Sequence, residues 1–410
     1  MIGFSMFEQR SGKIADPSGG ANQSRVRDYN ERLVLSLVRR HGSLAKSEIA
    51  RISGLSAQTV SVIMRSLESD GLLLRGEPQR GKVGQPSIPM RLDPNGVFSI
   101  GLKIGRRSAE LILVDFLGHQ RKSLSKTFAY PTPSELIAFS EAGIVELLEN
   151  LSSDEQKRIA GIGISMPFQL WNWAEKIGAP EDEMDAWRDF DFQSRLAALT
   201  NLPVIVQNDA TSACGAELVF GRGTELSDFV YFFIGTFIGG GIVLNHSVYS
   251  GRTGNAGGFG PMPVINDDGE TKTLIDHASV YTLEMRLKAE GIDLAPLWRE
   301  PEDWQSLGPL LDEWIADTAR HLAWAIVASC SIIDFQAAVI DGAFPPDIRQ
   351  RIVEAIQLEV AKLDTRGISD MVVLEGMVGR GARALGGASL PLFSRYLLDQ
   401  NVLFKGISQC

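Results

Sequence analysis

The apolar positions between residues 46 and 71 recur at helical spacing and predict two short helices joined by a tight turn. Gly54 allows the positive φ that a sharp turn needs, and the Ser56 side chain can cap the helix that follows. Apolar residues at positions 33–38 predict a further helix, so three helices could enclose a small core. This layout is typical of a helix-turn-helix that reads DNA. The residues of the shared apolar face are Ile49, Ile52, Leu55, Val60, Ile63 and Leu67.

The second of these helices would present small and hydrogen-bonding side chains outward, where they can approach base edges and phosphates. Residues 72–92 then predict two strands around a basic loop, and the glycines of the loop would let it follow DNA closely as a wing. The alternative is a helical hairpin beside a solvated strand pair. The predicted DNA contacts are Lys46, Ser56, Ala57, Gln58, Thr59, Ser61, Arg65, Arg80, Lys82 and Gln85.

From about Phe98 onward the pattern changes to alternating strands and helices, which predicts a mixed α/β body. One buried strand ends at Asn208 and Asp209, and a glycine-rich turn joins two further strands. The expected strands are a meander over 96–120 and the segments 159–166, 201–209, 229–245, 337–342 and 371–376, with helices over 134–151, most of 274–333 and 382–398.

Charge is distributed unevenly along the chain. Residues 25–91 carry 12 Lys/Arg and 6 Asp/Glu, whereas the whole chain carries 40 Lys/Arg and 50 Asp/Glu, a net charge of −10. A basic head on an acidic body favours contact with nucleic acid through the head, because the body repels phosphate.

Composition predicts a soluble cytoplasmic protein. The chain has 410 residues and 44% hydrophobic content, enough for a small domain and one large or two medium lobes. No apolar run predicts a membrane span, and residues 1–24 lack the features of a secretory signal, so we expect a flexible lead. Cys214, Cys330 and Cys410 lie far apart without metal-ligand spacing, which predicts buried or tail thiols and no disulfide framework.

Five segments follow the helix-turn-helix, at residues 207–223, 233–245, 250–264, 337–346 and 382–393. Together they resemble the ROK family, which joins bacterial repressors and sugar kinases. The resemblance implies an α/β fold: an N-terminal winged helix-turn-helix followed by a two-lobed actin-like ATPase (ribonuclease H-like) sugar-kinase fold. We expect a lead at 1–24, the DNA-binding domain at 25–92 and an effector-binding and oligomerisation domain at 93–410. The lobe boundary would fall near 205–215, with the C-terminal helix returning to the first lobe.

The resemblance also indicates what a kinase of this fold would need: two turns that wrap the phosphates, a carboxylate for Mg²⁺ and an aspartate base. Where the first turn should carry an acid, this chain has Lys103, and in the second turn Phe237 replaces a glycine. We therefore predict a protein that is not an enzyme, with no catalytic residue and no cofactor. Lys103, Arg106 and Arg107 could bind an anion instead, or form a solvated basic hairpin.

On the sugar side, Asn208 and Asp209 match the pair that the family places at a strand end, where they would hold vicinal hydroxyls. In an enzyme Asp209 would be the base; the alternative role of the pair is to cap the next helix. Gly258 stands where the family pattern has a glutamate, and it is kept as an effector-binding position. Ile275 stands where another sugar-binding glutamate is usual.

No metal site is predicted. Pro261 replaces the histidine that binds zinc in the family, and residues 265–279 contain no cysteine, so the family's ligand set is missing. His277 beside Asp276 is interpreted as an ordinary pair on a helix surface.

An insertion after residue 170 contains Trp171, Trp173 and Trp187, and such rings can stack on the apolar faces of a sugar. The alternative is that they are core or interface residues.

These observations together predict a cytoplasmic transcriptional regulator, a repressor of genes for carbohydrate uptake or catabolism. Its partners would be a palindromic double-stranded operator, a small sugar or sugar derivative, and a second copy of itself in a homodimer or homotetramer. Two alternatives stay open: a carbohydrate kinase with a DNA-binding head, and a regulator controlled by a protein partner.

Overall fold

The computed structural model describes residues 23–78, 88–265, 269–298 and 303–398. The chain divides into two compact units. The first unit comprises the chain up to Val206 and again from Gly387, and the second comprises Gln207–Gly386. Helix α14 (Ala382–Arg395) begins in the second unit and ends in the first.

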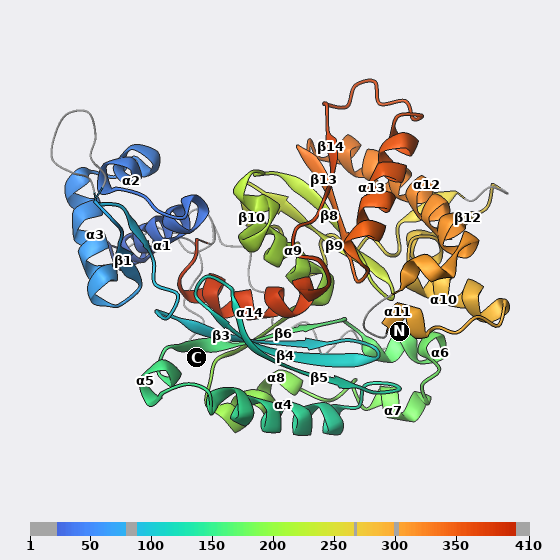
Figure 1. Cartoon of the computed structure of the whole chain (residues 1–410), viewed down its shortest axis with the longest axis horizontal. Helices are drawn as coiled ribbons and strands as arrows, with labels where there is room; N and C mark the ends of the chain where they lie inside the picture. Colours follow the sequence, from blue (N-terminus) through green and yellow to red (C-terminus); the bar gives the residue numbers. More distant parts are fainter. Residues whose placement is uncertain (1–22, 79–87, 266–268, 299–302, 399–410) are drawn as a thin grey trace. The chain divides into compact units, whose positions relative to one another are not determined.

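Three helices and a two-stranded antiparallel sheet form the N-terminal head, as the sequence predicts (Figure 1). Gly54 ends the second helix with φ 71°, and the Ser56 side chain accepts a hydrogen bond from the Thr59 N–H. Both features that the sequence predicts for this turn, the glycine with positive φ and the serine cap, are therefore present. The head elements are α1 (Gln23–His41), α2 (Lys46–Ser53), α3 (Ala57–Ser69), β1 (Leu73–Arg75) and β2 (Met90–Leu92).

Apolar side chains from all three helices form the core of the head. Ile52 corrects the predicted apolar face, because its side chain is 40% exposed, and Leu55 is half-buried. The buried members of this core include Val34, Val38, Ile49, Val60, Ile63, Met64 and Leu67.

Helix α1 is tied to the rest of the first unit by hydrogen bonds. Arg39 donates from Nη1 to the Phe116 carbonyl (2.7 Å) and from Nη2 to the Leu117 carbonyl (3.1 Å). The Leu398 N–H donates to Ser36 Oγ. Burial lowers the pKa of Arg39 to about 10, but its guanidinium stays charged at neutral pH.

A five-stranded sheet in the order β5-β4-β3-β6-β7 forms the body of the first unit (Figure 1). The first three strands pair antiparallel, as the predicted meander requires, and β6 runs parallel to β3. Helix α4 packs on β4 and β5. A Cβ added at Gly163 in β6 would lie 1.8 Å from the Gly387 carbonyl oxygen, so α14 packs closely on this strand. The bounds are β3 (Phe98–Ile104), β4 (Ser108–Asp115), β5 (Gln120–Thr127), α4 (Pro133–Leu148), α5 (Ser153–Gln156), β6 (Ile159–Met166), η2 (Leu170–Trp173), α6 (Ala174–Ile177), α7 (Glu181–Asp185), α8 (Phe192–Thr200) and β7 (Val204–Asn208).

The second unit has a five-stranded sheet in the order β10-β9-β8-β13-β14. Strands β8 and β9 form the predicted antiparallel hairpin, and β13 runs parallel to both of its neighbours. A mixed α/β fold is thus confirmed in both units. The bounds are α9 (Asp209–Phe220), η3 (Arg222–Thr224), β8 (Phe229–Ile234), β9 (Ile238–Leu244), β10 (Ser247–Val248), β11 (Pro263–Ile265), β12 (Thr271–Thr273), η4 (Leu274–Asp276), α10 (Val280–Ala289), α11 (Ala295–Trp298), η5 (Trp304–Leu307), α12 (Pro309–Ile332), β13 (Ala337–Gly342), α13 (Pro346–Val360), β14 (Val372–Glu375) and η6 (Gly379–Gly381).

The longest helix of the second unit, α12, packs against α10 and α13. Within the described residues, no helix combines the length and the apolar character needed to cross a membrane.

Candidate functional site

Helix α3 carries the side chains that the sequence assigns to DNA. Ala57, Gln58 and Arg65 are exposed, and Ser61 is half-buried; Lys46, at the start of α2, is also exposed. The Arg65 guanidinium donates to the Ser61 carbonyl of its own helix (3.1 Å). These side chains therefore lie at the surface of the head, where a DNA groove could meet them.

Two predicted DNA contacts have a structural role as well. The Ser56 Oγ accepts from the Thr59 N–H at 3.1 Å and lies 2.8 Å from Thr59 Oγ1. Because these hydroxyls already bond each other at the helix start, Gln58 and Arg65 are the better candidates for reading bases.

Val62 was missed by the sequence interpretation. Its side chain is 51% exposed on α3, and helical spacing places it with Gln58 and Arg65 on one face. An exposed apolar group at this position can contact a thymine methyl group. The spacing of four from Gln58 and three to Arg65 was the signal that could have found it.

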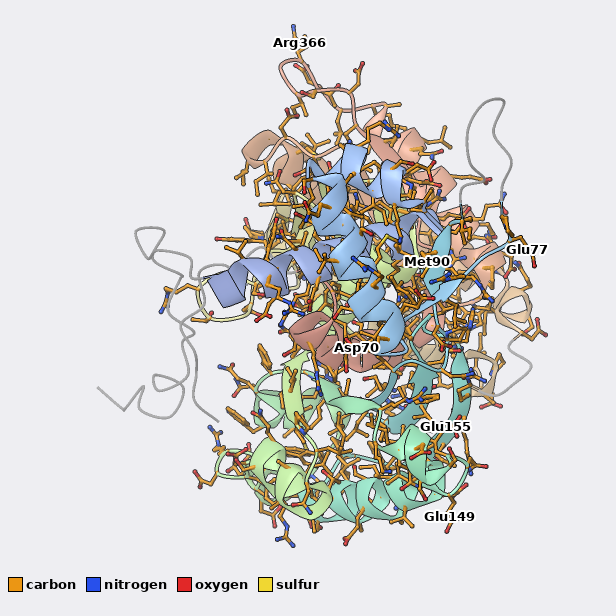
Figure 2. The ribbon with its side chains drawn as sticks, turned by 90° about the vertical axis from the view of Figure 1, so that its left-hand side faces the viewer. Asp70, Glu77, Met90, Glu149, Glu155 and Arg366 are labelled. Atoms are coloured by element: carbon orange, nitrogen blue, oxygen red, sulfur yellow. The ribbon has the colours of Figure 1, made fainter. Side chains whose placement is uncertain are left out.

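The wing is described only at its base. β1 and β2 pair antiparallel, and the bidentate contact of Arg75 with Glu68 ties β1 to α3. Figure 2 shows Met90 at the start of β2 and Glu77 beyond the end of β1. The predicted wing contacts Arg80, Lys82 and Gln85 lie outside the described residues.

The turn between β3 and β4, where the family resemblance predicts the first phosphate turn, is covered by the side chain of Lys103. Lys103 is only 8% exposed, and its Nζ donates to Ser108 Oγ (2.7 Å) and to the Ser108 carbonyl (3.2 Å). A Cβ added at Gly105 would lie 2.9 Å from Lys103 Cε, so the side chain covers the turn. Lys103 therefore does not belong to a solvated basic hairpin; Arg106 and Arg107 are half-buried beside it.

The second turn joins β8 to β9 and carries Phe237. Its ring is buried and packs edge-on against Tyr281 at a centroid distance of 5.5 Å. The turn is held by the Val280 and Tyr281 N–H groups, which donate to the Gly235 and Thr236 carbonyls. The benzyl group is thus part of the packing around this turn.

Asn208 and Asp209 lie where β7 passes into α9, but each already has a protein partner. The Asn208 side-chain oxygen accepts from the Ala210 and Thr211 N–H groups, so Asn208 is the residue that caps α9. Asp209 Oδ2 lies 3.5 Å from Nη1 of Arg383, whose guanidinium also sits 5.0 Å above the Phe233 ring. Arg383 is distant in sequence, and no local pattern pointed to it.

The loop that carries Gly258 reaches β9 by close backbone packing. A Cβ added at Gly257 would lie 2.5 Å from Gly241 Cα, and one added at Gly241 would lie 2.4 Å from Cys214 Cβ of α9. Gly258 itself is exposed. Ile275 is buried and its N–H donates to the Gly260 carbonyl, so it serves the core at the position where a sugar ligand is usual.

The tryptophans belong to the first unit, whereas Asn208, Asp209 and Gly258 belong to the second. Trp187 corrects the effector prediction: it is 4% exposed, its indole donates to the Pro131 carbonyl (2.9 Å), and its ring stacks on Phe192. A ring closed off in this way is a core residue. Trp171 packs partly against the same core, with Arg188 over its ring at 5.4 Å. Trp173 ends η2, and its side chain lies outside what the structure describes.

His277 and Asp276 do not form the predicted surface pair. Asp276 accepts from the Thr273 N–H and hydroxyl, whereas His277 faces Asp317 and stacks on His321 at a centroid distance of 3.7 Å.

Glu217 and Asp341 are two of the carboxylates that the second unit buries. Glu217 accepts from the Arg222 and Met377 N–H groups, and Asp341 accepts from the Gly379 N–H and the Tyr231 hydroxyl. Burial raises the pKa of both carboxyl groups, and the charge of Asp341 raises the pKa of Glu217 further.

Comparison with known proteins agrees with this arrangement. A putative xylose repressor from Caldicellulosiruptor sp. (strain Rt8B.4) is 27% identical over 336 residues, which cover 80% of this chain and 83% of the relative. A solved ROK family transcriptional regulator, a homolog of the E. coli MLC protein, has a TM-score of 0.64 at 19% identity and covers 93% of this chain and 100% of its own. A ROK family glucokinase from Streptomyces griseus, solved with glucose and AMPPNP, has a TM-score of 0.56 at 21% identity and covers 72% of this chain and 98% of its own.

The two solved structures share their fold with this chain. Residues 27–73 match the sequence model of a winged helix-turn-helix DNA-binding domain. Residues 99–391, which are more than half of the chain, match the sequence model of the ROK family, and the chain belongs to that family.

Proposed function

We propose that this chain is a cytoplasmic transcriptional repressor of genes for carbohydrate uptake or catabolism, and that a small sugar or sugar derivative controls its binding to an operator. The observation that carries the proposal is the exposed face of α3, with Gln58, Val62 and Arg65, in front of a ROK domain. The relative named as a putative xylose repressor supports a sugar as the effector class.

Paired heads would read the two halves of a palindromic operator. One helix-turn-helix buries too little DNA for tight specific binding, so the proposal includes a homodimer or a homotetramer. Gln58 would bond a base edge, Val62 would contact a methyl group, and Arg65 and Lys46 would bind phosphate or guanine.

The effector would meet the second unit at Asn208, Asp209 and Gly258. Because the Asn208 oxygen caps α9, the amide nitrogen is the group that would bond a sugar hydroxyl. Because Asp209 faces Arg383, a sugar hydroxyl would compete with the guanidinium for the carboxylate. Trp171 and Trp173 remain candidates for stacking on a sugar. Trp187 does not, because its ring is buried in the core.

The same geometry favours a regulator over a sugar kinase. The Lys103 side chain covers the turn that would wrap a phosphate, and the Phe237 ring is packed into the second turn. Neither turn offers the open backbone that a nucleotide phosphate would need.

The effector can act only by binding one arrangement of the protein more tightly than another. We expect that arrangement to hold the paired heads at a spacing that does not match the operator. Effector binding would then release DNA.

The test uses the full chain and DNA selected from a random pool on the purified protein. Fluorescence anisotropy with the selected DNA should show tight binding that a sugar in a panel of sugars, polyols and sugar phosphates weakens at least tenfold. A parallel assay of ATP turnover with the same panel should show none. Selection of no DNA sequence, or robust phosphorylation of a sugar, would overturn the proposal. DNA binding that responds to no compound would point to control by a protein partner.

A further inference from the structure

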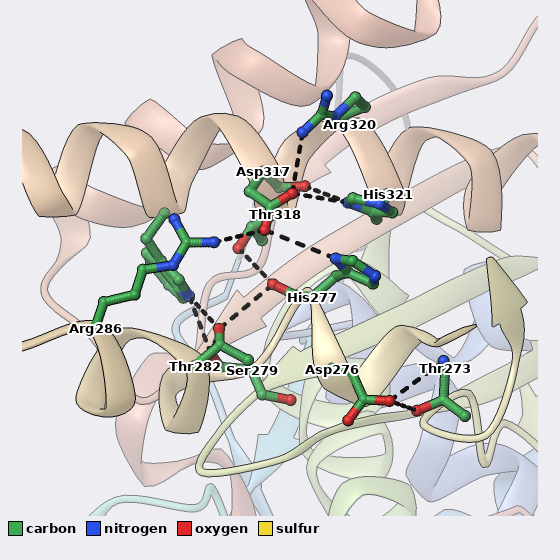
Figure 3. A network of polar contacts seen from close by, with 11 residues as sticks. Thr273, Asp276, His277, Ser279, Thr282, Arg286, Asp317, Thr318, Arg320 and His321 are labelled. Carbon is green, nitrogen blue, oxygen red and sulfur yellow. Dashed lines mark hydrogen bonds and ion pairs between the residues drawn. The ribbon is translucent and has the colours of Figure 1, made fainter. Parts of the chain in front are cut away.

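Three potential metal ligands meet between the end of η4 and the middle of α12. Asp317 Oδ2 lies 3.7 Å from His277 Nδ1, and Asp317 Oδ1 lies 3.2 Å from His321 Nδ1. One ligand atom from each residue can be chosen so that all three lie within 4.8 Å of one another. Figure 3 shows both rings beside this carboxylate. In the described part of the chain, no other group of three or more His, Cys, Asp or Glu side chains comes this close.

We propose that His277, Asp317 and His321 form a binding site for Zn²⁺ or a similar transition metal ion. Two imidazole nitrogens and one carboxylate oxygen are ligands that zinc prefers, and a tetrahedral ion bound by three protein ligands keeps one position for solvent or another ligand. The site differs from the zinc site of the family, whose ligand positions hold Pro261 and no cysteine in this chain.

Two arginines oppose the metal. Arg286 Nη2 lies 2.6 Å from Asp317 Oδ2, and Arg320 Nη2 lies 3.1 Å from Asp317 Oδ1. Both guanidiniums are partly exposed, at 31% and 41% for their side chains, so either can turn toward solvent. The stacked imidazoles must also tilt until their nitrogens converge on one ion. Binding is therefore a competition between the ion and the guanidiniums, and removal of one arginine should strengthen it.

The segment that follows His277 is hydrogen-bonded to the turn that carries Phe237. Just after His277 in the chain, Ser279 Oγ accepts from the Ile238 N–H, and the Val280 and Tyr281 N–H groups bond the turn itself. An ion that joins His277 to α12 would restrain this segment and, through it, the β8–β9 turn.

The experiment measures Zn²⁺ binding to the full chain after its metal has been removed with a chelator. Equilibrium dialysis should give one Zn²⁺ per chain for the wild type, and Zn²⁺ at about 100 times Kd should raise Tm by about 5 °C. Co²⁺ should give the visible absorption of a tetrahedral complex. His277→Gln and His321→Gln should each lose the bound ion and the Tm shift, whereas Arg320→Gln should bind Zn²⁺ about tenfold more tightly.

His119→Gln is the matched control. His119 Nδ1 also faces an aspartate, 3.3 Å from Asp115 Oδ2, and among the described residues it belongs to no such trio. This variant should keep the full response to Zn²⁺. Absence of stoichiometric binding in the wild type, or a response that persists in both the His277 and the His321 variants, would overturn the proposal. A circular dichroism spectrum of each variant distinguishes loss of the site from loss of the fold.

Discussion

The exposed face of α3, with Gln58, Val62 and Arg65, differs from the strand end at Asn208 in what its polar side chains already bind. On α3, Gln58 is exposed and Arg65 bonds a carbonyl of its own helix. At the strand end, Asn208 caps α9 and Asp209 faces Arg383. Because Arg65 is exposed, DNA can replace its bond to the helix carbonyl with little rearrangement, whereas a ligand of Asp209 must compete with a largely buried guanidinium.

Loss of Asp209 is expected to have the largest effect on this comparison. Asp209→Ala removes the carboxylate that would hold a sugar hydroxyl, so the effector should no longer release DNA, while operator affinity stays within about twofold. Anisotropy titrations with and without effector measure both quantities. Asp370→Ala, at an exposed position of the same unit, is the control and should respond normally. A normal response of Asp209→Ala would place the effector elsewhere.

On the side of the head, Arg65→Ala should weaken operator binding by roughly 10- to 100-fold, because a charged contact to DNA is lost in each half-site. The dependence of the affinity on salt should become flatter, since fewer counterions are released. Arg366→Ala, which removes an exposed charge of the second unit, should change neither quantity. If the two variants bind alike, α3 is not the reading helix.

A smaller effect is expected at the partner of Asp209. Arg383→Gln removes the charge that competes for the carboxylate, so the effector should bind roughly fivefold more tightly, which corresponds to about 1 kcal/mol for such a partly buried pair. Isothermal titration of the protein with the effector measures this change. Weaker effector binding would instead show that Arg383 itself contacts the ligand.

The smallest expected effect is a change in the pH dependence of stability, and it arises in the second unit and not in the head. The pKa of Glu217 is higher in the folded chain than in the unfolded chain, so the folded state holds the proton to a higher pH. The stability that Glu217 contributes is therefore fully present below the unfolded pKa of about 4.5 and is lost as pH rises through the folded pKa. Glu217→Gln should flatten this loss by on the order of 1 kcal/mol per unit of pKa difference.

Calorimetry of thermal unfolding from pH 4.5 to 8 measures this pH-dependent loss of stability. Glu225→Gln is the matched control, because Glu225 is 61% exposed and pairs with Arg222 at the surface. Equal pH dependence of the two variants would contradict the role given to the buried carboxylate.

The head could be predicted from the sequence because its determinants are local. The turn at Gly54, the cap at Ser56 and the spacing of apolar residues all act within a few residues of one another. Ile52 was misjudged, since the periodicity places it near the apolar face but not inside it. The fold of the body was predicted from its resemblance to a family.

The candidate sites of the body could be predicted only in part, because their partners come from distant segments. Nothing near Asp209 in the sequence indicates Arg383, and nothing near His277 indicates Asp317 or His321. Trp187 shows a second reason: an aromatic ring suits a sugar and a core equally well, and only its burial and its bond to Pro131 decide between them.

The bond between Arg39 and the turn after β4 has a consequence for how this protein can diverge. The guanidinium binds the carbonyl oxygens of Phe116 and Leu117, and every amino acid supplies such an oxygen. Substitutions at those two positions can therefore accumulate while the hydrogen bonds persist, whereas Arg39 itself has no simple replacement. Relatives that keep these hydrogen bonds between head and body should therefore vary at the positions of Phe116 and Leu117 but retain the arginine at position 39.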